Sequence, residues 1–160
     1  MEYIDDINKA KAQKKQLNRK VSDLKNVNEK KLDQLFQNAH EEVFEEIDCL
    51  SCANCCKTTS PIFRDIDIKR IASHLKITSA EFIDSFLNMD HEGDYVLKKS
   101  PCNFLGEDNK CSIYAHRPLA CREYPHTNRK RMYQILDLTK KNAQICPAVS
   151  IIILDKISIK

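Results

Sequence analysis

Cysteine is the residue type with the clearest chemical potential in this chain. Four of its eight cysteines form the run Cys49-x2-Cys52-x2-Cys55-Cys56. The other four follow later in the chain, at Cys102, Cys111, Cys121 and Cys146. A short cysteine-dense chain is stabilised either by disulfides or by metal, so the state of these thiols decides what the protein can do.

The cellular compartment separates these two possibilities, because thiols stay reduced in the cytosol. The N-terminal stretch lacks the apolar run of roughly 7–15 residues that a secretory signal needs. The longest apolar run near either end covers residues 151–154, far short of the roughly 20 residues of a membrane span. We therefore expect a cytoplasmic protein with no membrane partner. The adjacent pair Cys55-Cys56 also argues against disulfides, because neighbouring cysteines are poorly placed to bridge each other.

Thiolate is a soft ligand that selects zinc, copper(I) or iron–sulfur clusters. A Cys-x2-Cys turn lets two sulfurs converge on one metal centre, as in zinc knuckles. Cys49, Cys52 and Cys55 have the spacing of the first three ligands in a bacterial ferredoxin, and Cys146-Pro147 has the local form of the remaining ligand. The expected cofactor is thus zinc or iron, with a 4Fe–4S cluster as one form of the latter.

The number of metal centres stays open at this point. Eight cysteines could build one buried cluster with spare thiols, or two tetrahedral sites of four thiolates each. The side chains of Cys55 and Cys56 leave the backbone in different directions, which favours two centres or one larger cluster.

The elements that must position these cysteines are expected to be mainly helical. Only two glycines occur, which disfavours a fold of many tight hairpins. Apolar residues recur at steps of three and four over 31–47 and 65–75, and Thr78 with Glu81 forms a capping-box pattern that opens another helix. Further helices are expected at 130–141 and from 149 onward, although the isoleucines of the last segment also suit a strand.

The clearest strand signals lie in the middle of the chain. Tyr95-Val96-Leu97 is typical of a short strand, and a turn around Gly106 predicts a small hairpin between Phe104 and Ile113. We therefore expect a compact, cysteine-rich, metal-stabilised domain over 31–160, mainly α with a small β-hairpin. Residues 1–30 are expected to form a basic, partly helical or flexible arm.

The charge of this arm raises the question of a polyanionic partner. Residues 9–31 carry nine Lys or Arg residues against two acidic ones, whereas the net charge of the chain is only +3. A solvated helix face is the expected interpretation of such a run, and nucleic-acid binding is not expected. An adaptor that binds nucleic acid or protein through the arm remains an alternative function.

Several short segments around the cysteines resemble one bacterial family. They are Cys49-Leu-Ser-Cys-Ala-Asn-Cys-Cys56, Pro101-Cys102-Asn-Phe-Leu105, Cys111-Ser-Ile-Tyr114, Arg117-Pro118 and Cys121-Arg122-Glu-Tyr-Pro125. Over about residues 49–150 the chain is similar to the cysteine-cluster family called YkgJ, described as a zinc- or iron-chelating domain. The resemblance implies metal binding. A branch of that family is fused into flagellin lysine methylases, which keeps a redox or methyl-transfer-associated enzyme component as a second alternative.

No catalytic constellation accompanies the cysteines. The only glycines are Gly93 and Gly106, so neither a Rossmann fingerprint nor a phosphate-binding loop can be assembled. Arg117 and Arg122 flank Cys121, and their guanidinium groups could offset the negative charge of a thiolate cluster or pair with surface carboxylates. We expect a small metal-binding protein rather than an enzyme, with all eight cysteines as ligands and no predicted protein partner.

Overall fold

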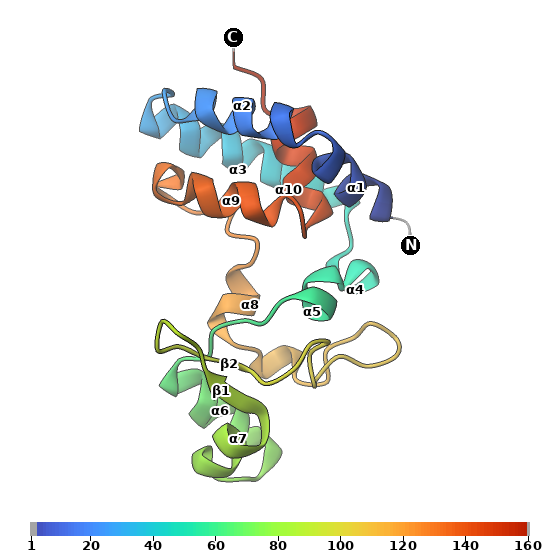
Figure 1. Cartoon of the computed structure of the whole chain (residues 1–160), viewed down its shortest axis with the longest axis vertical. Coiled ribbons are helices and arrows are strands. Elements are labelled where there is room, and N and C mark those ends of the chain that lie inside the picture. The colour runs from blue at the N-terminus through green and yellow to red at the C-terminus, as the bar shows by residue number, and fades with distance from the viewer. Residues whose placement is uncertain (1–2, 160) are drawn as a thin grey trace. The chain divides into compact units, whose positions relative to one another are not determined.

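The computed structural model describes residues 3–159, which are mainly helical and include a two-stranded antiparallel sheet. The expected fold class, mainly α with a small β-hairpin, is confirmed. The chain divides into two compact units, which Figure 1 traces by colour. Unit 1 contains residues 1–52 and 125–160, and unit 2 contains residues 53–124.

Unit 1 is a bundle built from both ends of the chain. Helix α1 packs on α10, α2 packs on α9 and η3, and α3 packs on η2, η3 and α10 (Figure 1). The elements are α1 (Ile4–Ala12), α2 (Lys14–Leu24), α3 (Glu29–Glu46), α4 (Cys49–Cys52), η2 (Met132–Ile135), α9 (Leu136–Asn142), α10 (Pro147–Ile151) and the π-helical turn η3 (Ile152–Lys156). The terminal segment is therefore helical, which settles its helix-or-strand ambiguity.

The stretch predicted as an arm, residues 1–30, supplies α1 and α2 to this bundle. Leu17, Val21 and Leu24 follow one another at steps of four and three, so they share a helix face, and all three are buried. Burial of that face holds the segment against the C-terminal helices. Helix α3 begins at Glu29 because the Asn28 side chain accepts hydrogen bonds from the backbone N–H groups at the start of the helix.

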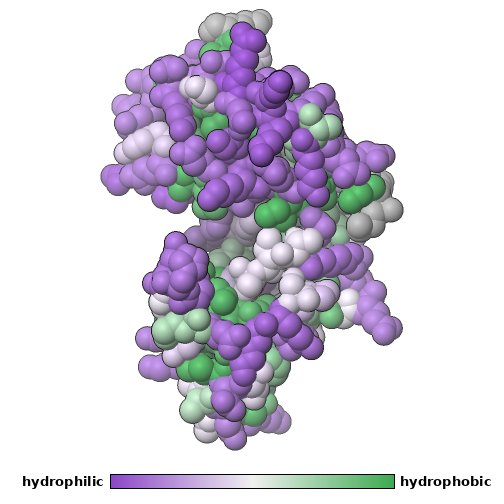
Figure 2. Space-filling model, in the orientation of Figure 1, coloured by the Kyte–Doolittle hydropathy of each residue, from purple (hydrophilic) through white to green (hydrophobic). Residues whose placement is uncertain are grey.

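The basic residues of α1 and α2 lie on the outside of unit 1, whose visible face is mostly hydrophilic (Figure 2). Two of them, and Lys25 directly after α2, bind groups of the unit itself. Lys9 pairs with Asp155 at 2.7 Å, Lys25 pairs with Asp137 at 3.0 Å, and the Lys20 ammonium donates to the Leu154 carbonyl at 2.6 Å. Exposed ion pairs of this kind add little stability, so apolar burial holds the bundle together.

Unit 2 contains the predicted helix over 65–75 and the predicted capping box. Its elements are α5 (Asn54–Thr58), α6 (Asp65–Leu75), α7 (Ser79–Phe86), β1 (Leu87–Met89), β2 (Tyr95–Leu97), η1 (Tyr114–His116) and α8 (Leu119–Glu123). Thr78 accepts the Glu81 N–H at 3.1 Å, and the Glu81 carboxylate accepts the Thr78 N–H at 2.7 Å. Both predictions are confirmed.

The sheet contains one strand that the sequence pattern did not predict. Leu87 directly follows α7, takes an extended conformation and pairs with Leu97 across the sheet. The connecting turn needs a positive φ, which Gly93 adopts at +86°. The hairpin predicted between Phe104 and Ile113 is reduced to one isolated bridge, between Leu105 and Cys111.

An aromatic core holds unit 2 together. Phe82 is fully buried, and its ring contacts Phe63, Phe86 and Phe104 at centroid distances of 5.2–6.2 Å. Phe104 belongs to the loop that carries Cys102 and Cys111, so this core supports that loop directly. No helix within residues 3–159 combines the length and the apolar character needed to cross a membrane.

Candidate metal centre

The two units divide the cysteines between them. Unit 2 holds Cys55, Cys56, Cys102, Cys111 and Cys121, and unit 1 holds Cys49, Cys52 and Cys146. The division falls within the Cys-x2-Cys-x2-Cys-Cys run. Helix α4 ends at Cys52, Ala53 adopts a left-handed conformation with φ +47°, and α5 begins at Asn54. The first two and the last two cysteines of the run therefore belong to different short helices.

Backbone hydrogen bonds place Cys102 beside α5 and Cys111 beside Cys102. The Cys102 N–H donates to the Cys56 carbonyl at 2.8 Å. The Ser112 N–H donates to the Phe104 carbonyl at 2.8 Å, which closes the loop next to the Leu105–Cys111 bridge. Three cysteines that are separated by up to 55 residues in the sequence, from Cys56 to Cys111, are thus gathered by main-chain contacts within unit 2.

Cys121, on α8, completes this group. Burial is the main cause that raises the pKa of the Cys121 thiol to about 12. The thiols of Cys56, Cys102 and Cys111 add to this rise in pKa, and the Arg117 guanidinium opposes it. Thiolates at these positions would repel one another, so ionisation of one thiol affects the others. We call Cys56, Cys102, Cys111 and Cys121 the unit 2 thiol group.

Backbone N–H groups point toward two of these sulfurs. Burial raises the pKa of Cys102, and N–H groups of Phe104 and Leu105 counter the rise. The Phe104 nitrogen lies 3.4 Å from the Cys102 sulfur. Burial likewise raises the pKa of Cys111, and the Ile113 N–H counters it. Donors of this kind stabilise a thiolate once a metal has displaced the proton, and they orient the sulfur toward the metal.

Cys55 and Cys56 are adjacent and interact with each other. The pKa of Cys56 lies above its usual value, first because of a hydrogen bond with the Cys55 side chain and second because of burial. The sequence predicted that the two side chains leave the backbone in different directions, whereas this hydrogen bond brings their thiols together. In the structure described here, the two thiols are hydrogen-bonded neighbours.

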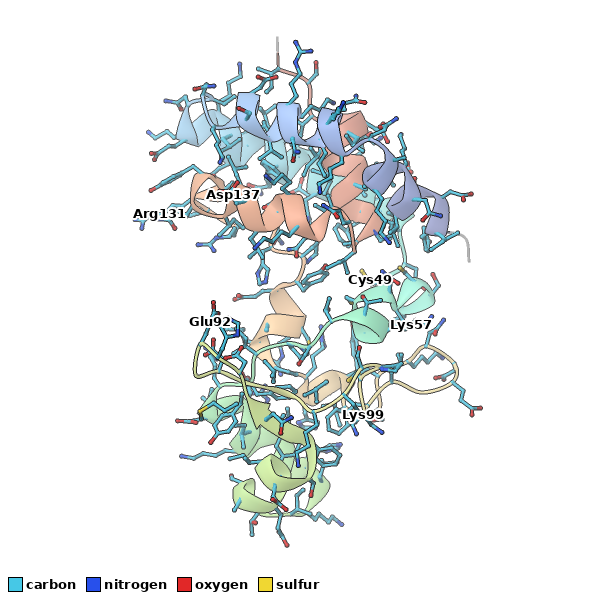
Figure 3. All side chains as sticks on the ribbon, viewed as in Figure 1. Cys49, Lys57, Glu92, Lys99, Arg131 and Asp137 are labelled. Carbon is cyan, nitrogen blue, oxygen red and sulfur yellow. The ribbon has the colours of Figure 1, made fainter. Side chains whose placement is uncertain are left out.

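The three cysteines of unit 1 form a second group. Burial is the main cause that raises the pKa of Cys146 to about 12, and the thiols of Cys49 and Cys52 contribute to the rise. N–H groups of Val149 and Ala148 oppose it, since Cys146 immediately precedes α10. Cys49 lies on α4, as Figure 3 shows. Three thiolates are one ligand fewer than a closed tetrahedral zinc site requires.

The spacing of the sulfurs bears on the kind of metal. In the described part of the chain, no three cysteine sulfurs of one unit lie all within 4.8 Å of one another. A single zinc ion with zinc–sulfur bonds of about 2.3 Å would hold its four sulfurs about 3.8 Å apart. Binding of a single zinc ion would therefore draw the thiol side chains closer together.

A cluster of three carboxylate side chains, which was not predicted, has ligand atoms within this 4.8 Å spacing. Ligand oxygens of Asp90, Glu92 and Asp94 lie within 4.8 Å of one another, and Figure 3 shows Glu92 at the β1–β2 turn. These side chains serve the turn: Asp90 Oδ1 accepts the N–H groups of Glu92 and Asp94, each at 2.9 Å. These hydrogen bonds, above all the one from the Asp94 N–H, lower the pKa of the Asp90 carboxyl. Turn formation accounts for this group without a metal.

The two arginines that flank Cys121 differ in their contacts. Arg117 lies over the Tyr114 ring, 3.8 Å from its centroid, and its charge opposes the rise that burial causes in the pKa of Cys111 and Cys121. Arg122 instead donates to the backbone carbonyls of Ala115 at 3.0 Å and Arg117 at 3.2 Å. Arg117 thus acts on the thiols through its charge, and Arg122 holds the backbone between Cys111 and Cys121.

The fold and the thiol groups together define a mainly helical, cysteine-rich domain. Residues 48–147 match the CxxCxxCC family, whose description is "putative zinc- or iron-chelating domain". The chain belongs to this family, which confirms the resemblance expected from its cysteine-containing segments and supports the binding of zinc or iron.

One curated relative matches part of the chain. Over 86 residues the chain is 31% identical to an uncharacterized protein of Methanocaldococcus jannaschii. The match covers 52% of this chain and 46% of the relative, so the chain spans less than half of that protein's length. The comparison with solved structures found no match.

Proposed function

We propose that the chain is a metal-binding protein of the cytoplasm whose centre in unit 2 is held by the thiolates of Cys56, Cys102, Cys111 and Cys121. The observation that carries the proposal is the main-chain contact that brings Cys102 beside Cys56 and closes the loop to Cys111, with Cys121 close enough for all three thiols to act on its pKa. Four thiolates form a complete ligand set for zinc or for an iron–sulfur cluster.

Of the two metals, we propose iron in the form of an iron–sulfur cluster for this centre. No three sulfurs of the group lie within 4.8 Å of one another, so zinc would have to draw them together. A 4Fe–4S cluster binds each thiolate through a different iron atom and spreads the four sulfurs further apart. When bound, the cluster would supply a one-electron redox centre, and Arg117 would offset part of its negative charge.

The experiment that tests the proposal is purification without oxygen, followed by metal and sulfide analysis and an absorption spectrum. Stoichiometric iron and sulfide, with a broad band near about 400 nm, is the expected result. Colourless protein with stoichiometric zinc would support the four-thiolate site but show that its metal is zinc instead of an iron–sulfur cluster. Protein that contains neither metal, and that takes up neither in reconstitution, would contradict the proposal.

A second prediction concerns protons. The unit 2 thiols have pKa values above their ordinary range, so the metal-free protein holds them protonated at pH 7.5. Binding of one zinc(II) ion by all four thiolates should then release about four protons, and the apparent affinity should rise with pH. Calorimetric titration in buffers of different ionisation enthalpy measures this number. Release of two protons or fewer would show that only part of the group binds.

A further inference from the structure

A buried carboxylate lies in unit 2, away from the thiols themselves. The Asp67 side chain is only 1% exposed, although it carries a charge. A buried charge is costly unless it is paired and hydrogen-bonded, so its partners indicate what the fold gains from it.

Asp67 binds two separate parts of the chain. One oxygen, Oδ2, accepts the backbone N–H of Arg64 at 3.2 Å, as expected for the third residue of helix α6. The other oxygen, Oδ1, accepts the Arg70 guanidinium at 2.8 Å and the backbone N–H of Leu119 at 3.2 Å. Leu119 is the first residue of α8, two positions before Cys121.

Arg70 extends this contact along the same segment. Its guanidinium donates to the carbonyl of His116 at 3.3 Å and to the carbonyl of Arg117 at 2.9 Å. Asp67 and Arg70 therefore hold the backbone at three positions between Cys111 and Cys121. We call these two residues, with their bonds to His116, Arg117 and Leu119, the α6 brace.

Helix α8 depends on the brace for its own start. It is five residues long, it follows Pro118, and no local side chain caps it. The N–H groups of a first helical turn need acceptors. Asp67 supplies one from a different helix, so the direction in which α8 leaves the turn is set by α6.

Helix capping alone does not explain this arrangement. Arg64 with Asp67 and Thr78 with Glu81 are the capping boxes of α6 and α7. In the box of α7 the Glu81 carboxylate is exposed and accepts the backbone N–H of Thr78, within the box itself. At Asp67, burial raises the pKa, but the hydrogen bonds of Arg70, Arg64 and Leu119 outweigh burial and lower it overall. The carboxylate is thus held in its charged form, which suits an acceptor of several strong hydrogen bonds.

We infer that Asp67 and Arg70 are positioning residues for the metal centre: they fix the segment 116–119 so that Cys121 faces the thiols of Cys56, Cys102 and Cys111. This inference rests on the proposed function, because it assigns the two residues a role at that site. Partners hydrogen-bonded directly to metal ligands typically contribute 10–100-fold to metal affinity, and we expect Asp67 and Arg70, which hold the backbone beside Cys121, to act on the same scale.

The test is a titration of the full-length, metal-free chain with cobalt(II), followed by thiolate-to-cobalt absorption. Asp67→Asn and Arg70→Gln should each weaken cobalt(II) binding by about 10–100-fold and alter the shape of the absorption bands. Arg70→Lys keeps the charge but not the forked geometry, and should recover only part of the affinity. Glu81→Gln, in the capping box of α7, and Lys69→Gln, on the exposed side of α6, are the matched controls.

The outcomes separate the inference from the proposed function. A wild-type chain that shows no thiolate-to-cobalt absorption would contradict the proposed four-thiolate site itself. Wild-type binding together with unchanged affinity in Arg70→Gln would overturn the inference alone. An equal loss of affinity in Glu81→Gln would also overturn it, because the effect would then follow general stability. Arg70 is partly exposed, so Arg70→Gln decides the matter even if Asp67→Asn does not fold.

Discussion

Substitution of Cys121 by serine is expected to reduce the metal affinity of unit 2 by more than about 100-fold. The loss should exceed the 10–100-fold effect of removing an outer partner, because a direct ligand disappears. The other three members of the unit 2 thiol group all raise the pKa of Cys121, so this thiol lies close to each of them. Its removal leaves a site with three thiols. Metal content after anaerobic purification, together with competition against a chelator, measures the effect.

The control for this prediction lies in the other unit. Cys146→Ser changes a buried thiol of unit 1 that interacts with Cys49 and Cys52. It should leave the metal of unit 2 in place. If both variants lose all metal together, the eight cysteines serve one shared centre, and the separate unit 2 site is wrong.

Loss of metal should also lower stability, because binding free energy contributes to folding when the ligands are brought together only in the folded chain. Cys121 follows Cys56 by 65 positions, so a shared metal cross-links distant segments of unit 2. Chelation of the wild-type protein should therefore lower the midpoint of thermal unfolding, whereas Cys121→Ser should respond little to chelator. Equal unfolding midpoints of loaded and metal-free wild-type protein would contradict a structural role for the metal.

The second large effect is expected from Phe82→Ala. Phe82 is fully buried, and truncation of a buried phenylalanine typically costs about 3–5 kcal/mol. The ring stacks on Phe104 with an interplanar angle of 11°, and the Phe104 N–H points at the Cys102 sulfur. The substitution should therefore destabilise unit 2 and loosen the loop that carries Cys102. Amide hydrogen exchange in α6 and α7 gives the free energy of opening of this unit.

Ile66→Ala is the matched control for that truncation. Ile66 is 61% exposed on the neighbouring helix α6, so the loss of its side chain removes little buried surface. Its effect on the free energy of opening should stay below about 0.5 kcal/mol. A cost of less than about 1 kcal/mol for Phe82→Ala would mean that the aromatic core does not support the unit.

Local features of the sequence were sufficient to predict several elements. Helix α6 follows from apolar residues at helical steps, and the start of α7 follows from Thr78 and Glu81, because both signals act over three or four residues. The thiolate chemistry is local too, since it depends on residue type and on short Cys-x2-Cys spacing. Membership of the chelating family could be expected on the same cysteines.

Features that depend on long-range packing could not be predicted in this way. The packing of α2 could not be predicted, because the C-terminal elements that it contacts, α9 and η3, are more than 100 positions away in the sequence. The strand β1 was missed because Leu87 becomes extended only through its pairing with Leu97. The contact of Asp67 with Leu119 could not be predicted either, since the two residues are 52 positions apart.

The sequence by itself thus determined which atoms can bind a metal and which local segments are helical, because residue chemistry and short-range periodicity do not depend on the rest of the fold. Only the tertiary structure decided which thiols share a unit and how α8 is aimed. The physical reason is that backbone hydrogen bonds such as Cys102 to Cys56, and the buried contact of Asp67 with Leu119, form only once distant segments have packed together.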